Sequence, residues 1–219
     1  MALEMADADH RERWLTLGET ALVILVLQAY LLWRPSRSAD LLAVGTAAVL
    51  VALLLRRRGE SLRSLGLTDF AAQRRALAPL GLLGLTIVAG AVAWYAWSGA
   101  LRPGYDAKGL LLGLAIYPLW GLAQQVLYLG FVWRGLLRAR VPVAVATTVT
   151  TLAFGLVHLP NWPLVALTAP LGLAFAVVYQ RAPALLLIAL VHGIAGALAL
   201  KLLGLNLEIG ALYHCAVPV

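Results

Sequence analysis

Long apolar runs separated by short polar segments dominate the sequence. A helix of about 20 apolar residues crosses the hydrocarbon core of a bilayer, where every backbone amide must be hydrogen-bonded within the helix. We therefore predict an all-α fold, a polytopic membrane helical bundle of about seven transmembrane helices, in a single integral membrane domain over residues 1–219. The predicted spans, of which the second and sixth are short, are Leu15–Trp33, Leu41–Leu55, Ala76–Trp97, Leu110–Trp133, Val141–Leu159, Trp162–Tyr179 and Ala184–Leu203.

The composition agrees with this pattern. Of the 219 residues, 62% are hydrophobic and 12% are charged, whereas roughly 25% of the residues in a typical soluble domain are charged. The mean hydropathy is +0.88. The N-terminal segment "MALEMADADHRERW" contains four acids and lacks a small-residue cleavage site before the first apolar run. It does not resemble a secretory signal peptide, so we expect it to remain in the mature protein.

The basic residues predict the orientation. With seven spans, twelve Lys and Arg residues fall on the side of the N-terminus and five on the other side. The positive-inside rule then places the N-terminus in the cytoplasm and the C-terminus outside, and we expect the membrane to be a bacterial inner membrane. Topology and anionic headgroups account for the net charge of +7, so we expect membrane lipid, and no nucleic acid, as a partner. The pattern predicts no oligomeric state.

Two polar features outside the spans carry less information. The segment Arg56–Ala76 is the longest polar stretch, and it is either a short helix on the cytoplasmic surface or a solvated basic loop. Cys215 is the only cysteine. It therefore excludes an internal disulfide framework.

The polar side chains inside the predicted spans are few. All carboxylates lie in tails, in loops or, for Glu19, at the beginning of the first span. His158 and His192 lie in or at the end of apolar helices, and Gln124 and Gln125 stand side by side in the fourth span. One such residue can be a packing residue that is hydrogen-bonded across helices, but intramembrane polar groups commonly mark functional sites. Because these four come from three helices, we predict that they share one site.

Helical spacing adds Tyr128 to the catalytic candidates. Steps of three and four residues place Tyr117, Gly121, Gln124 and Tyr128 on one helix face. The tyrosine hydroxyls on this face can donate and accept hydrogen bonds.

The two histidines also have neighbours at helical spacing. Thr151 and Phe154 precede His158 on one face, and Gly196 lies one turn after His192, where it leaves room beside the ring. The candidate substrate-binding residues are therefore Phe154, Tyr117, Thr151 and Gly196.

Three short segments in the second half of the chain match a known set in order and spacing. They are "QQVLYLG" (Gln124–Gly130), "FGLVH" (Phe154–His158) and "HGIAG" (His192–Gly196). In these segments the chain resembles the CPBP family, the CAAX-protease and bacteriocin-processing membrane proteins, which carry Glu-Glu-x-x-x-Arg, Phe-x-x-x-His and His-x-x-x-Asn. The resemblance implies an intramembrane protease fold, with a CPBP-like core over residues 110–203.

The resemblance also implies roles for individual residues. In the family, the first glutamate and the first histidine activate a water, while the second histidine and the asparagine stabilise the oxyanion. By position, the base falls on Gln124, its partner on His158 and the oxyanion donor on His192. A neutral amide cannot accept a proton at ordinary pH, so the glutamate-dependent route is closed. Here the family's two glutamates are replaced by Gln124 and Gln125, its arginine by Leu129 and its asparagine by Gly196.

Three functions stay open at this point. The first is an intramembrane hydrolase of the CAAX-endopeptidase type that acts on a hydrophobic or prenylated peptide, with an unusual base such as His158. The second is a catalytically silent relative that binds a membrane peptide or a partner protein. The third is acid–base chemistry by histidine and tyrosine on an isoprenoid or lipid. We expect no cofactor and no metal, because two neutral imidazoles without a carboxylate or thiol make a poor zinc site.

Overall fold

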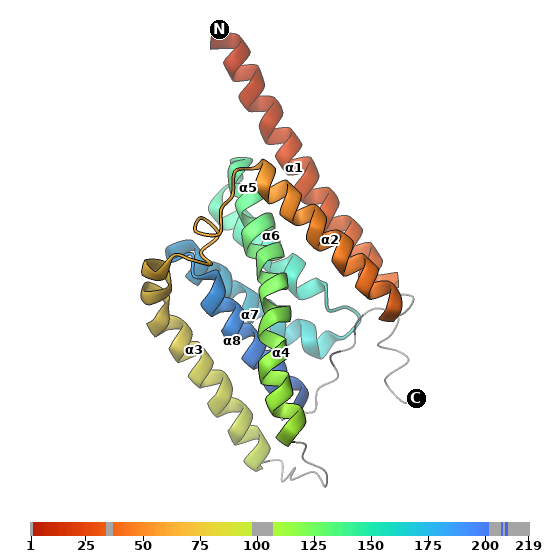
Figure 1. Cartoon of the computed structure of the whole chain (residues 1–219), viewed down its shortest axis with the longest axis vertical. Helices are drawn as coiled ribbons and strands as arrows, with labels where there is room; N and C mark the ends of the chain where they lie inside the picture. Colours follow the sequence, from red (N-terminus) through yellow and green to blue (C-terminus); the bar gives the residue numbers. More distant parts are fainter. Residues whose placement is uncertain (1, 34–36, 98–106, 202–206, 208, 210–219) are drawn as a thin grey trace. The chain divides into compact units, whose positions relative to one another are not determined.

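The computed structural model describes residues 2–33, 37–97, 107–201, 207 and 209. His214 and Cys215 lie outside these ranges. Within them, the regular secondary structure is helical, as predicted. The helices are α1 (Ala2–Trp33), α2 (Arg37–Arg57), α3 (Phe70–Trp97), α4 (Ala107–Gln125), the π-helix η1 (Val126–Trp133), α5 (Arg134–Arg138), α6 (Val143–Leu156), α7 (Trp162–Arg181) and α8 (Leu185–Lys201) (Figure 1).

The lengths of these helices confirm a multi-pass membrane protein. Among the described residues, five helical stretches are long and apolar enough to cross a membrane, and two shorter apolar helices, Val143–Leu156 and Leu185–Leu200, follow them in the second half. The second and sixth runs, which looked short in sequence, are both long enough. The fifth helix is instead shorter than predicted, because turns occupy Val157–Pro160.

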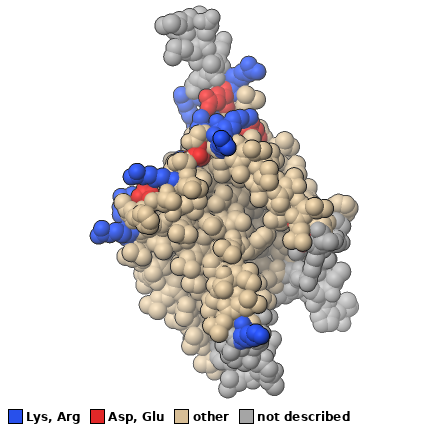
Figure 2. All heavy atoms as spheres, viewed as in Figure 1, with Lys and Arg blue, Asp and Glu red and all other residues tan. Residues whose placement is uncertain are grey.

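The surface of the helices is suited to lipid. Large apolar side chains such as Leu41, Leu42 and Trp97 are about four-fifths exposed. In Figure 2 the charged side chains gather near helix ends, and the surface between them is uncharged. Burying such a surface in hydrocarbon, rather than exposing it to water, is favourable by roughly 25 cal/mol per Å² of apolar area. The protein is therefore an integral membrane protein.

The described chain forms two compact units. Unit 1 takes in the described parts of Met1–Gly59 and Leu127–Val177, and unit 2 those of Glu60–Val126 and Val178–Leu207. In unit 1, α1 and α2 run side by side as an antiparallel pair (Figure 1). Tyr30 Oη donates a hydrogen bond to Asp40 Oδ1 (3.0 Å) near the connection, and the Glu19 carboxylate pairs with Arg57 and Arg58 near the other end.

In unit 2, α8 packs along α4 and against α3. The segment before α3 is anchored to the turn between α7 and α8. Tyr179 Oη donates to the carbonyl of Leu65 (3.1 Å), and a Cβ on Gly66 would lie 1.8 Å from the carbonyl oxygen of Pro183. Gly66 also has a φ of +81°, a conformation that glycine adopts without strain.

The segment Arg56–Ala76 matches neither of the two interpretations drawn from the sequence. Its residues 62–66 form turns rather than a surface helix, and Leu65 is buried. The segment is nevertheless more than a solvated loop, since Gln73 on α3 donates to the Gly66 carbonyl and accepts a hydrogen bond from the backbone N–H of Leu187 on α8.

Candidate functional site

The predicted site residues divide between the two units, and each unit brings part of the set together. Those in unit 2 are Tyr117, Gln124, Gln125, His192 and Gly196. Those in unit 1 are Tyr128, Thr151, Phe154 and His158. The convergence of both sets on one cavity stays a prediction.

In unit 2, glycines allow α4 and α8 to approach closely. A Cβ on Gly193 would lie 2.3 Å from the backbone nitrogen of Pro118, and a Cβ on Gly121 would lie 2.8 Å from the carbonyl oxygen of Ala189. One turn after Gly193, a Cβ on Gly196 would lie 2.9 Å from a ring carbon of Tyr117. The two helices therefore meet backbone to backbone, and this contact puts His192 next to α4.

Gln125, rather than Gln124, hydrogen-bonds to His192. Its Nε2 lies 3.0 Å from His192 Nδ1, and the Gln125 side chain is buried, whereas Gln124 is half-buried. An amide nitrogen can only donate, so Nδ1 accepts and the ring proton is on Nε2. A carboxylate at this position would require the opposite arrangement, with a proton on Nδ1. The contact with Gln125 therefore makes His192 a hydrogen-bond donor at Nε2.

In unit 1, three rings pack edge to face. The Phe154 ring lies 5.2 Å from that of Tyr128 and 5.7 Å from that of His158, both T-shaped. Gly172 of α7 makes room for Phe154, because a Cβ there would lie 2.6 Å from a ring carbon. Phe154 is thus buried between the rings of Tyr128 and His158, and His158 lies in the turn that follows α6.

The contacts of His158 determine its tautomer. Its Nδ1 lies 3.3 Å from the carbonyl oxygen of Gly155 and 3.1 Å from Thr168 Oγ1. A carbonyl can only accept, so the proton is on Nδ1. The Thr168 hydroxyl donates its own proton to the carbonyl of Leu164 (2.8 Å), and its oxygen has a lone pair that can accept the proton on His158 Nδ1. His158 therefore presents an unprotonated Nε2, the form that a general base requires.

The fourth span changes helix type directly after the glutamine pair. The α-helix ends at Gln125 and the π-helix η1 begins at Val126. π-Helical turns are rare, have poorer geometry than α-helix and occur frequently at functional sites. Tyr128 lies in this segment, so the 3.6-residue spacing that grouped it with Tyr117 does not extend to it. No feature of the sequence predicted this change.

Two polar residues of unit 1 were missed by the sequence analysis. Thr168 lies on α7, whereas His158 lies in the turn before that helix, and no spacing rule connects them. Gln28 on α1 donates from Nε2 to the carbonyl oxygen of Ala153 (3.2 Å), next to Phe154. The sequence did contain a feature that points to Gln28: it is an amide inside an apolar span, as are Gln124 and Gln125.

The site contains no carboxylate among the residues placed here. In the described part of the chain, no three His, Cys, Asp or Glu side chains come together as a metal site would require. The predicted site residues therefore offer neutral groups: two imidazoles, amides and hydroxyls.

The comparison with known families covers this part of the chain. The family model described as "type II CAAX prenyl endopeptidase Rce1-like" matches residues 106–198. Over this segment, which is less than half of the chain, the protein is similar to this Rce1-like family. The matched segment includes every predicted site residue of both units, and it confirms the family resemblance drawn from the three short segments. No curated protein and no solved structure gives a significant match.

Proposed function

We propose that the protein is an intramembrane hydrolase of the CAAX-endopeptidase type that cleaves a hydrophobic or prenylated peptide by a histidine-dependent route. The observation that carries the proposal is the pair of opposite tautomers at the two family histidines. His158 offers an unprotonated Nε2 and His192 a protonated one, which are the two complementary roles that hydrolysis requires. The family match supports the same reaction class.

The proposed reaction uses only these neutral groups. His158 Nε2 takes a proton from water, and the hydroxide attacks the scissile carbonyl carbon. His192 Nε2–H donates to the oxyanion that forms, with Gln125 holding the ring in its donor tautomer. The C–N bond then breaks as the protonated His158 returns its proton to the leaving amine. Thr168 is a positioning residue, because it binds the far side of the His158 ring.

The activity test compares histidine variants after reconstitution in lipid. With prenylated peptides as substrates, we expect His158→Ala or His192→Ala to lower cleavage by about 10²–10⁴-fold, the usual contribution of general acid–base groups and oxyanion donors. The matched control is His10→Ala, since His10 is exposed on α1, and it should cleave like wild type. Gln124→Glu should not raise cleavage, because the family's arginine and asparagine are also replaced, by Leu129 and Gly196.

Other results of the same assay would identify the rival functions. Peptide binding without cleavage would favour a silent binding protein. Turnover of isoprenoids in place of peptides would favour lipid chemistry. Cleavage that survives loss of both histidines would refute the proposal.

We also infer that the protein lies in a bacterial inner membrane with its N-terminus in the cytoplasm, from the uneven distribution of Lys and Arg. Reporter fusions to the two ends test this orientation, and an N-terminus found outside would contradict it.

A further inference from the structure

A second polar site lies in unit 1, and it contains none of the candidate catalytic or substrate-binding residues. It is a pocket of about 460 Å³ between α1, the end of α2 and α5, within the range of roughly 300–1,000 Å³ that is usual for ligand sites. We call it the arginine pocket. Its lining residues are Arg11, Glu12, Leu15, Thr16, Arg57, Arg58 and Arg138.

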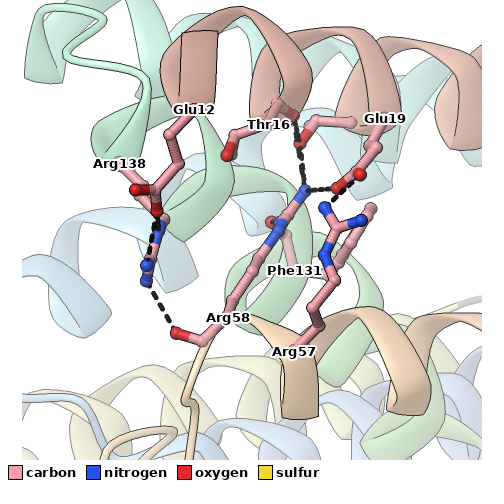
Figure 3. Close-up of polar contacts among 8 residues, drawn as sticks. Glu12, Thr16, Glu19, Arg57, Arg58, Phe131 and Arg138 are labelled. Carbon is pink, nitrogen blue, oxygen red and sulfur yellow. Dashed lines mark hydrogen bonds and ion pairs between the residues drawn. The ribbon is translucent and has the colours of Figure 1, made fainter. Parts of the chain in front are cut away.

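Arg58 forms the fixed part of the arginine pocket. Its guanidinium donates to the carbonyl oxygens of Phe131 (3.2 Å) and Thr16 (3.3 Å) and to Thr20 Oγ1 (3.0 Å), and it stacks 4.2 Å above the Phe131 ring (Figure 3). The Arg58 side chain is only 4% exposed. Burial lowers the pKa of Arg58 while the Glu19 carboxylate opposes that shift, and an arginine keeps its charge in either case. A buried Nε–H of Arg58 finds no acceptor among the described residues.

Two further arginines of the pocket are exposed. The side chains of Arg57 and Arg138 are 58% and 41% exposed, and they pair with Glu19 and Glu12, respectively (Figure 3). Exposed ion pairs are weak, typically below about 1 kcal/mol, so a stronger anion can displace them. Among the pocket residues and these ion-pair partners, four arginines face two carboxylates, which leaves an excess of two positive charges.

The pocket lies at one boundary of the membrane. The first candidate span begins at His10, the second ends at Arg57 and the fourth ends at Arg138. All three boundaries flank the pocket, so it lies at the level of lipid headgroups. Its apolar lining residue is Leu15, which is exposed. Two turns further along α1, Leu22 is also exposed, so the two leucines lie on one apolar face of the helix. A ligand with a phosphate and an acyl chain would match both parts.

We propose that the arginine pocket binds the phosphate of an anionic lipid headgroup, with Arg11 and Arg57 contacting the phosphate above the fixed guanidinium of Arg58. Arginine suits this role because its planar fork donates two hydrogen bonds to a phosphate at once. Basic pockets between transmembrane helices are a common form of headgroup site. The inference is independent of the proposed hydrolase function, since none of its residues belongs to that site.

The test is lipid binding by native mass spectrometry on the full chain, titrated with phosphatidylglycerol against a phosphatidylcholine background. The double variant Arg11→Gln/Arg57→Gln should bind the first phosphatidylglycerol roughly 10–30-fold more weakly than wild type, given the usual contribution of each arginine near a membrane surface. Because Arg57 also pairs with Glu19, the single variant Arg11→Gln is measured too, and it should lose roughly fivefold.

The matched control is Arg74→Gln/Arg75→Gln, which removes the same charge from exposed positions on α3. It should bind like wild type, and millimolar inorganic phosphate should not displace the lipid. Equal losses in the two double variants would show a general effect of surface charge and overturn the proposal. So would wild-type binding by both pocket variants, or displacement by inorganic phosphate, which would indicate a site for the free anion.

Discussion

At the scale of single residues, Gly193 has the largest influence on the unit 2 half of the site. It lies next to His192, and its missing Cβ lets the backbone of α8 touch that of α4 at Pro118. Pro118 has no N–H to be hydrogen-bonded within α4, and it tolerates this contact without losing a helical hydrogen bond of its own. The distance between His192 and Gln125 depends on this approach.

We expect Gly193→Ala to destabilise the protein by about 1–3 kcal/mol, since the added Cβ meets backbone atoms that cannot rotate away. Thermal unfolding in detergent measures the effect. The control is Gly90→Ala on α3, where a Cβ would have no neighbour within 4 Å and the higher helix propensity of alanine should preserve stability. Equal unfolding temperatures for the two variants would refute the close contact of α4 with α8.

At the scale of helices, the link between Arg58 and η1 is the feature of most consequence. The Phe131 carbonyl that receives the Arg58 hydrogen bond lies in the π-helix. Gly135, on α5, leaves space for this link, because a Cβ there would lie 2.6 Å from Thr20 Oγ1 and 2.7 Å from Arg58 Nη1. The end of α2 therefore supports the unusual geometry of η1.

Replacing the buried guanidinium should weaken η1. We expect Arg58→Met to lower the free energy of unfolding by about 2–4 kcal/mol, because three buried acceptors lose a charged donor. Hydrogen–deuterium exchange should accelerate in Val126–Trp133. Arg63→Met, at an exposed position in the following loop, is the control and should change neither quantity. An unchanged exchange rate in η1 for Arg58→Met would contradict the proposed support.

At the scale of the whole molecule, the central question is whether the two family histidines act together. His192 belongs to unit 2 with Gln125, and His158 belongs to unit 1 with Thr168. The order of the family segments along the chain is the basis for predicting a shared cavity. The proposed reaction requires it, since base and oxyanion donor must contact one substrate.

Cross-linking tests this convergence directly. In a Cys215→Ser background, we expect His158→Cys and His192→Cys to be joined by a short thiol cross-linker, so that the chain stays in one piece after proteolysis between the two positions. The control pair replaces His158→Cys with Leu152→Cys, which lies on an exposed part of α6 and should not cross-link. Equal cross-linking of both pairs, or of neither, would show that the histidines do not share a cavity.

The sequence by itself determined the helical membrane architecture and the resemblance to a known family over the second half of the chain. Hydrophobicity acts locally and adds along a segment, so seven apolar runs sufficed to predict the helices, and their lengths alone excluded a soluble fold. The order of the Gln124, Phe154 and His192 segments likewise lies in the chain itself. Helix ends were less well predicted, because turns such as the one after Leu156 depend on local hydrogen bonds that hydropathy does not register.

Only the tertiary structure decided which side chains meet. The choice of Gln125 over Gln124 as the partner of His192 follows from the contact at Gly193, and the contact of the His158 ring with Thr168 follows from the packing of α7. The burial of Arg58 beneath a pocket of exposed arginines was equally invisible, since an arginine run after a span reads as a solvated helix end. A hydrogen bond depends on distances of a few tenths of an ångström between segments far apart in the chain, and these distances arise only when glycines, prolines and rings have packed.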